Sequence, residues 1–281
     1  MMVIGIFTHE PIQKNRSWKI LNYLHLANRI IIVLLLGLFS NAHGHDGAQD
    51  KDVLTVFVDS NYPPYMYELE GTLADGLYPR LLQEVVNQAG EKVAVKAYPW
   101  KRALIYSEEG KGAVAGAYKN AERLKFYDYS NSLYQEKLVL FVNKNKPFEF
   151  NSIADLKGKV VGVNRGWSYG QEFDDARANK LFDVNIRNHP DENFKMLALG
   201  RIDCLILDKQ SGDSFIKIMG IKDQVVSLPN AFSVNDGYLI VPKKMKMAGF
   251  IAKFNAALEQ IKKDGTYNKI VKTYIQGEIS K

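Results

Sequence analysis

Two oppositely charged side chains in this sequence have the types and places needed to hold a zwitterion, a molecule with one carboxylate and one ammonium. Arg123 offers bidentate, charge-assisted hydrogen bonds to a carboxylate. Asp208, which follows the apolar run Ile202–Leu207, offers a carboxylate to an ammonium. Ligands of open α/β sheets bind beyond the carboxyl ends of strands, where we expect both residues. The alternatives are an ion pair of Arg123 with Glu122 or Asp128, and a helix N-cap at Asp208.

Alternating strand-like and helix-like segments must position these side chains. Short apolar runs predict strands at 53–58, 93–98, 138–142, 159–163 and 202–207. Helical spacing and capping residues predict helices after Asp75, Pro99, Ser152, Ser168 and Asp191, and from Phe250. This alternation predicts an α/β fold of mostly parallel sheets covered by helices. The residues after position 42 exceed a usual single core, so we expect two α/β lobes.

The charge balance and the single cysteine exclude several classes of protein. The chain has 37 basic and 31 acidic side chains, a formal charge of +6, and part of that excess lies in residues 1–42. A nucleic-acid-binding protein would need a concentrated basic face, which the remainder does not indicate. Cys204 alone permits neither an intrachain disulfide nor a multi-cysteine metal site. No phosphate-binding loop, dinucleotide glycine pattern or nucleophile elbow occurs, so we expect no cofactor.

The N-terminal segment predicts export. A basic stretch ends at Asn28-Arg29, an uncharged apolar run covers residues 30–39, and Ser40-Asn41-Ala42 supplies the small residues of a cleavage site. The apolar run is too short to span a bilayer, although an uncleaved anchor or a buried helix is the alternative. Cleavage after Ala42 would expose His43-Gly44-His45, which with the new amine could bind copper or nickel. The alternative is an ordinary flexible terminus, and we expect no metal.

Six short motifs carry a resemblance, and they follow one another in a fixed order. They are Tyr62-Pro63-Pro64-Tyr65, Gly71-x4-Gly76, Glu122-Arg123 with Phe126-x3-Ser130, residues 156–163 with Gly166, residues 199–203, and residues 264–270. In this order the chain from about Val53 to Ile275 resembles the bacterial extracellular solute-binding proteins of family 3, the polar-amino-acid-binding components of ABC importers.

The resemblance implies the periplasmic-binding-protein type II fold, with two mostly parallel sheets joined by a hinge of two crossing strands. Lobe one would comprise residues 43–136 plus 236–281, and lobe two residues 137–235. The helices from Phe250 onward would return to lobe one. The two lobes would close on a ligand by hinge motion.

The resemblance also implies roles for the charged and aromatic residues. Arg123 lies where the family places the arginine that binds the ligand carboxylate, and Asp208 where it places the acid that binds the ammonium. Tyr62 and Trp100 match positions where an aromatic ring stacks on the ligand, and a buried core anchor is the alternative for Trp100. Asp59, directly after the first strand, is expected to join them in the site.

The remaining expected site residues include two departures from the family pattern. Ser168, after the Gly166 turn, keeps one of two family hydroxyls, while Trp167 replaces the other with a bulky ring. Gly116-Ala117-Tyr118 stands where the family usually has two small hydroxyl residues before the arginine, a change that would reshape the pocket. We therefore expect Gly116, Tyr118, Trp167 and Ser168 to line the ligand site.

The function implied is that of a periplasmic, monomeric solute-binding protein that delivers an amino-acid-like ligand to an ABC permease in the inner membrane. No reaction is implied. One alternative is an enzyme on the same scaffold, similar to the periplasmic cyclohexadienyl dehydratases, with Asp208 or Glu172 as general acid. The other alternative is a ligand-sensing partner of a membrane receptor.

Overall fold

The computed structural model of the protein describes residues 53–277. The expected signal peptide, residues 1–42, and the His43-Gly44-His45 sequence lie outside the described residues. Within the described part, none of the helices has the length and apolar character needed to cross a membrane.

The elements of the first half of the described chain alternate between strand and helix, as predicted. They are β1 (Leu54–Asp59), β2 (Asn61–Tyr62), β3 (Met66–Glu68), β4 (Ala74–Asp75), α2 (Leu77–Gln88), β5 (Val93–Tyr98), α3 (Trp100–Glu108), β6 (Ala113–Ala117), α4 (Arg123–Phe126) and β7 (Tyr127–Asn143). The second half contains β8 (Val160–Asn164), α5 (Gln171–Ala178), β9 (Asp183–Arg187), α6 (Pro190–Ala198), β10 (Cys204–Asp208), α7 (Lys209–Met219), β11 (Val225–Pro242), α8 (Ala248–Lys263) and α9 (Thr266–Val271).

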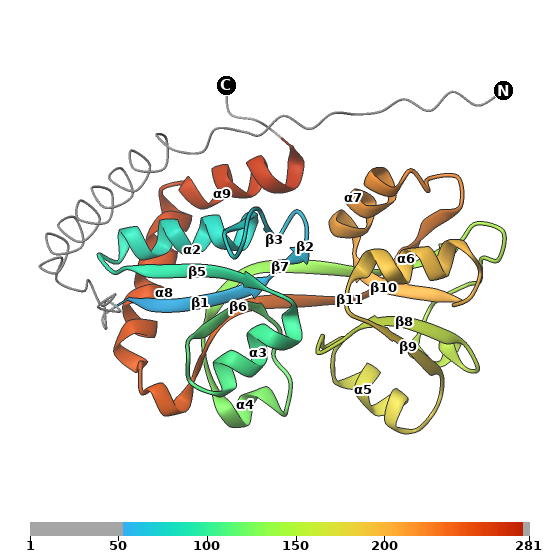
Figure 1. The fold of residues 1–281 in the computed structure, drawn as a ribbon, viewed down its shortest axis with the longest axis horizontal. Helices are drawn as coiled ribbons and strands as arrows, with labels where there is room; N and C mark the ends of the chain where they lie inside the picture. Colours follow the sequence, from blue (N-terminus) through green and yellow to red (C-terminus); the bar gives the residue numbers. More distant parts are fainter. Residues whose placement is uncertain (1–52, 278–281) are drawn as a thin grey trace, which may run out of the picture. The chain divides into compact units, whose positions relative to one another are not determined.

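The expectation of two separate, mostly parallel sheets needs a correction. The main strands form one hydrogen-bonded sheet in the order β5-β1-β6-β11-β7-β10-β8-β9, and β2, β3 and β4 form a small second sheet. Neighbours are parallel at both ends, but β11 is antiparallel to β6 and β7, and β7 is antiparallel to β10. The sheet is continuous because the long strands β7 and β11 serve both lobes (Figure 1).

The two long strands are also where the expected lobe boundaries fall. Glu136 on β7 pairs with Asn235 on β11, and Gln135 pairs with Asp236. The boundaries expected after residues 136 and 235 therefore lie opposite each other in the ladder. In Figure 1, β1, β5 and β6 with α2, α3 and α8 lie on one side of this crossing, and β8, β9 and β10 with α5, α6 and α7 lie on the other.

Lobe one has the larger apolar core and includes the C-terminal helices. Leu77, Leu81, Leu82, Val85 and Val86 of α2 are buried at helical spacing, and each such side chain contributes about 1.5–3 kcal/mol of burial. The helix α8 packs on both α2 and β7, so the end of the chain lies against the helix that follows the small sheet. This packing holds the strands of lobe one in place.

Several local predictions were wrong in their details. Gly76, rather than Asp75, is the N-cap residue of α2, because the Asp75 carboxylate instead accepts hydrogen bonds from the Tyr67 and Tyr274 hydroxyls. His189, not Asp191, is the N-cap residue of α6. The helix expected from Ser168 begins three residues later, as α5. The segment 153–156 is a 3₁₀ turn capped by Ser152.

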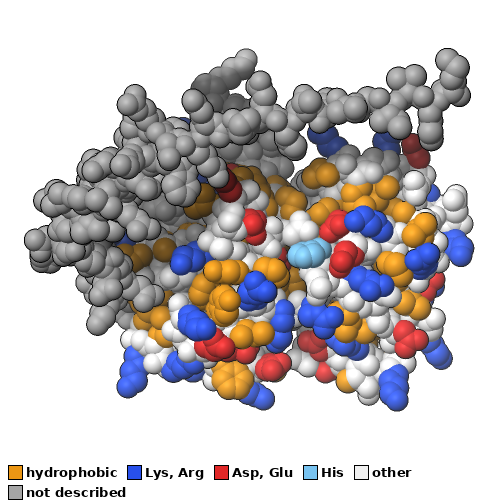
Figure 2. Space-filling model, in the orientation of Figure 1, with side chains coloured by type: hydrophobic (Ala, Val, Ile, Leu, Met, Phe, Trp, Pro, Cys, Tyr) orange, Lys and Arg blue, Asp and Glu red, His pale blue; other side chains and the backbone are white. Residues whose placement is uncertain are grey.

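The surface charges of the described residues are mixed in sign. On the face shown in Figure 2, Lys and Arg side chains are interspersed with Asp and Glu side chains. That face therefore lacks the concentrated positive field that a nucleic-acid-binding surface needs.

Candidate ligand-binding site

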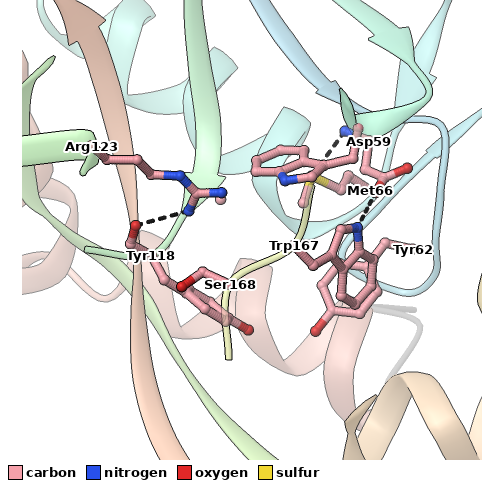
Figure 3. Close-up of a pocket in the computed structure, with 9 residues that line it drawn as sticks. Asp59, Tyr62, Met66, Tyr118, Arg123, Trp167 and Ser168 are labelled. Carbon is pink, nitrogen blue, oxygen red and sulfur yellow. Dashed lines mark hydrogen bonds between the residues drawn. The ribbon is translucent and has the colours of Figure 1, made fainter. Parts of the chain in front are cut away.

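A small cavity lies between the lobes. Both lobes contribute to its walls, lobe two through the loop that follows β8 (Figure 3). The structure brings eight of the nine residues predicted from the sequence to this cavity, and it adds Met66, so that the lining residues are Asp59, Tyr62, Met66, Trp100, Gly116, Tyr118, Arg123, Trp167 and Ser168. Asp208 is the predicted residue that does not line it.

The sheet explains why these side chains meet. Asp59 is the last residue of β1, Gly116 is near the end of β6, and Trp167 follows the end of β8. All three lie at the carboxyl ends of parallel strands, which is where open α/β sheets place their ligands. Pro99 is the N-cap residue of α3, so the helix begins at Trp100, and the Trp100 side chain lines the same cavity.

Arg123 is a buried guanidinium without a carboxylate partner in the described part of the chain. Its side chain is 8% exposed, and burial lowers its pKa from the usual value. Nη1 donates to the carbonyl of Tyr118 at 2.9 Å, and Nη2 donates to the carbonyl of Gly166 at 3.2 Å. The ion-pair alternative is not observed, since Asp128 pairs with Lys243. A guanidinium has five N–H donors, so three make no hydrogen bond within residues 53–277 and can bind a ligand oxygen.

Hydrogen bonds and aromatic contacts hold the two lobes together at the cavity. Trp100 Nε1 of lobe one donates to the Gly166 carbonyl at 3.1 Å, and Trp167 Nε1 of lobe two donates to Asp59 Oδ2 at 3.1 Å. The ring of Trp167 also meets the Tyr62 ring edge-on, with 4.7 Å between the centroids. The structure therefore shows a closed arrangement in which each lobe completes the wall of the other.

Asp59 is the carboxylate that lines the cavity. It is buried and accepts hydrogen bonds from the Asn61 backbone N–H and from Trp167 Nε1. Burial raises its pKa to about 6, although these two hydrogen bonds favour the ionised form. Figure 3 shows Asp59 and Arg123 on opposite sides of the cavity. The cavity thus has one acidic and one basic side.

Asp208 has the role that the sequence left as its alternative. Its carboxylate caps α7 by accepting hydrogen bonds from the backbone N–H groups of Gln210 and Ser211. It also accepts a 2.7 Å hydrogen bond from the Tyr65 hydroxyl, and the residue is only 2% exposed. An aspartate that ends a strand immediately before a helix is well placed to serve as N-cap, and here all three hydrogen bonds fall on Oδ1.

The sequence analysis missed Glu136, a buried carboxylate beside the cavity. Both of its oxygens accept hydrogen bonds from tyrosine hydroxyls, Oε2 from Tyr62 and Tyr118 and Oε1 from Tyr78. Tyr62 and Tyr118 line the cavity, so Glu136 lies directly behind its wall. Met66 was also missed, although it directly follows the Tyr62–Tyr65 motif.

Neither acid proposed for an enzymatic alternative lies in the cavity. Glu172 is exposed on α5, and Asp208 caps α7. Within residues 53–277, no three His, Cys, Asp or Glu side chains gather closely enough to hold a metal ion. A wider groove with side chains of both signs, including Lys101, Lys125 and Asp174, shares Arg123, Trp167 and Ser168 with the cavity.

Comparisons with known proteins agree with this architecture. The chain is 22% identical over 258 residues to the L-cystine-binding protein TcyJ of Escherichia coli (strain K12), covering 89% of this chain and 94% of that protein. It is 26% identical to the lysine/arginine/ornithine-binding periplasmic protein of the same strain, covering 87% and 95%. The structure of an ancestral arginine-binding protein bound to arginine matches with a TM-score of 0.69 at 27% identity, covering 79% and 98%.

These relatives are binding proteins rather than enzymes, which agrees with the expectation that the chain catalyses no reaction. The structural match confirms the predicted type II fold. The family match extends over residues 54–277, most of the chain. The chain therefore belongs to the bacterial extracellular solute-binding proteins, family 3.

Proposed function

We propose that this protein captures an amino acid in the cavity between its lobes and delivers it to an ABC importer. The observation that carries the proposal is the Arg123 guanidinium, which is buried in the cavity and has no carboxylate partner within residues 53–277. Such a desolvated cation is costly unless an anion joins it. A ligand carboxylate would supply that anion.

The other walls of the cavity support an amino acid as the ligand. The rings of Tyr62, Trp100 and Trp167 give it apolar faces, and Asp59 places an anion on the side opposite Arg123. Aromatic faces and carboxylates both attract an ammonium.

The names of the relatives suggest where to begin the search for the ligand. L-Cystine, lysine, arginine and ornithine are the ligands named for two of them. A thermal-shift screen of the proteinogenic L-amino acids, L-ornithine and L-cystine would identify the compound that raises the melting temperature. If no compound in that panel raises it, the proposal of an amino-acid ligand is wrong.

The role of Arg123 can be tested on the compound found in the screen. We expect Arg123→Ala to weaken its binding by about 2–5 kcal/mol, because the variant leaves a buried ligand carboxylate without its partner. The matched control is Arg102→Ala, which removes an exposed guanidinium from α3. Calorimetry should find the control unchanged, and equal dissociation constants for both variants would remove Arg123 from the site.

The export of the protein through residues 1–42 is part of the same proposal. The family consists of extracellular solute-binding proteins, and the apolar run at residues 30–39 has the flanks of a signal peptide. N-terminal sequencing of protein released by osmotic shock should begin at His43. Recovery of the intact N-terminus in the membrane fraction would instead support an anchor.

A further inference from the structure

Glu136 is fully buried at the point where β7 crosses between the lobes. The hydroxyls of Tyr62, Tyr78 and Tyr118 donate hydrogen bonds to its two carboxylate oxygens. The three tyrosines come from β2, α2 and the loop after β6. We call Glu136 and these three residues the tyrosine cage.

The tyrosine cage is built into the backbone of the neighbouring strands. Gly237 of β11 lies against Tyr78 so closely that a Cβ at this position would overlap the phenol hydroxyl. Gly116 of β6 likewise faces the ring of Tyr78, with its ideal Cβ position 3.1 Å from the nearest ring atom. Two glycines on neighbouring strands therefore make the room in which the Tyr78 hydroxyl reaches Glu136.

No cation of the described chain balances this carboxylate. None of the ion pairs within residues 53–277 includes Glu136. The groups that face it are the three cage tyrosines, with Tyr65 and Asp208 nearby, and Asp208 adds a second acid rather than a cation. Burial first, and then the charge of Asp208, raise the pKa of Glu136 to about 8. Hydroxyl donors lower the cost of the buried charge but do not neutralise it.

Two members of the tyrosine cage also form the wall of the ligand cavity. Tyr62 and Tyr118 line the cavity, whereas Tyr78 does not. Figure 3 shows the two hydroxyl groups directed toward each other. A phenol oxygen that donates its hydrogen to Glu136 keeps lone pairs that can accept a hydrogen bond from an ammonium. Both hydroxyls could therefore contact a ligand cation without leaving the carboxylate.

We propose that Glu136, when ionised, supplies the negative charge that balances the ligand ammonium, acting through the hydroxyls of Tyr62 and Tyr118. This inference rests on the amino-acid ligand proposed above. It names the group that makes the site prefer an amino acid over an acid without an ammonium. Glu136 thus has the task that the sequence indicated for Asp208, which does not line the cavity and whose Oδ1 caps α7. It is a positioning residue, since its carboxylate reaches the ligand through the two hydroxyls.

The test compares pairs of ligands that differ in one charge. Each L-amino acid that raises the melting temperature is paired with the matching acid, in which hydrogen replaces the ammonium. Calorimetry then compares wild type with Glu136→Gln, which keeps the shape of the side chain and removes its charge. We expect Glu136→Gln to weaken the binding of the amino acid by about tenfold or more. The binding of the matching acid should stay nearly unchanged, since the lost interaction involves a charged partner.

Two cage variants separate ligand recognition from stability. Tyr118→Phe and Tyr78→Phe each remove one hydrogen bond to Glu136, but only Tyr118 lies on the cavity wall. Both should lower the melting temperature, whereas only Tyr118→Phe should reduce the preference for the amino acid over its matching acid. Equal preferences in the two variants would show that the tyrosine cage is only structural and would overturn the proposal.

The pH profile gives a second readout that a structural role would not produce. Binding of the amino acid by wild type should tighten as pH rises through about 8, as Glu136 becomes ionised, and Glu136→Gln should lack this rise. If the amino acid binds in an Arg123-dependent manner but equally well to Glu136→Gln, this inference fails and the amino-acid function stands. If no amino acid binds wild type, both fail together.

Discussion

Arg123 and Glu136 are two buried ionisable side chains of opposite type, the first lining the cavity and the second directly behind its wall, and neither has an ionic partner within the described chain. Arg123 is held by two backbone carbonyls, one from each lobe, whereas Glu136 is held by three tyrosine hydroxyls. Neutral dipoles therefore orient both charges. A protein that needed only stability would pair or replace such charges, because unpaired buried charges are costly.

The difference between the two regions lies in how each can respond to a ligand. The Arg123 bond to the Gly166 carbonyl crosses between the lobes, so a ligand carboxylate that binds the remaining N–H groups lies beside an interlobe contact. The bonds of the tyrosine cage need not break, since each hydroxyl can accept from an ammonium while still donating. We infer that the Arg123 region couples binding to lobe closure and that the tyrosine cage sets selectivity.

The largest effect on stability is expected from Gly237→Ala. The added methyl group would overlap the Tyr78 hydroxyl and force Tyr78 away from Glu136, which should cost about 1–3 kcal/mol by overpacking. The matched control is Gly249→Ala in α8, where a Cβ meets nothing within 4 Å and alanine favours the helix. Urea denaturation should find the first variant less stable and the second no less stable than wild type. Similar stabilities for the two variants would argue against a tightly packed tyrosine cage.

A smaller effect is expected from Trp167→Phe on the acidic side of the cavity. The variant keeps an aromatic ring against Tyr62 but removes the N–H that donates to Asp59 across the lobes. We expect a loss of about 1 kcal/mol in the free energy of unfolding, since Asp59 keeps its bond from the Asn61 N–H. Unchanged denaturation would show that this interlobe bond contributes nothing to the closed form.

The smallest expected effect is a dependence of stability on pH, which involves Glu136 and not Arg123. The pKa of Glu136 is raised from 4.5 to about 8, so the folded protein keeps a proton that the unfolded chain loses. Its contribution to stability is complete below about pH 4.5 and is lost as pH rises toward about 8. Asp59 contributes in the same direction, with a pKa of about 6.

Comparison with Glu136→Gln isolates the contribution of Glu136. The melting temperature of wild type should fall relative to that of this variant as pH rises from 5 to 8. This window is taken from the raised pKa of Glu136. Arg123→Ala should show no such trend in this window. A constant difference for Glu136→Gln would mean that the carboxylate is already ionised at low pH.

The sequence predicted the strand-end residues of the site because their signal is local. Asp59 follows a short apolar run, Ser168 follows a glycine turn, and Arg123 lies in the Glu122-Arg123 motif, and the type II fold fixes where such positions meet. The same local logic failed at Asp208, because a strand-end aspartate serves a ligand or a helix equally well by sequence. Only the fold shows that Gln210, Ser211 and Tyr65 all donate to Oδ1 of Asp208.

Glu136 could not be found in this way because its environment is assembled from distant segments. Tyr62 and Tyr78 lie 74 and 58 residues before it, and the sequence around it alternates with the exposed Gln135 and Lys137. A lone acid beside exposed polar residues is typical of a solvated strand face. The long strands β7 and β11 were underestimated for a similar reason, since their polar central parts lack the apolar pattern that predicts a strand.

The most direct test of the central claim is the coupling between Arg123 and the ligand carboxylate. Calorimetry would measure the binding of the amino acid found in the screen and of its decarboxylated amine, each to wild type and to Arg123→Ala. If Arg123 binds the carboxylate, the substitution should weaken the binding of the amino acid by about 2 kcal/mol or more beyond the loss that it causes in the binding of the amine. An equal loss for both compounds, or no loss for either, would contradict the account.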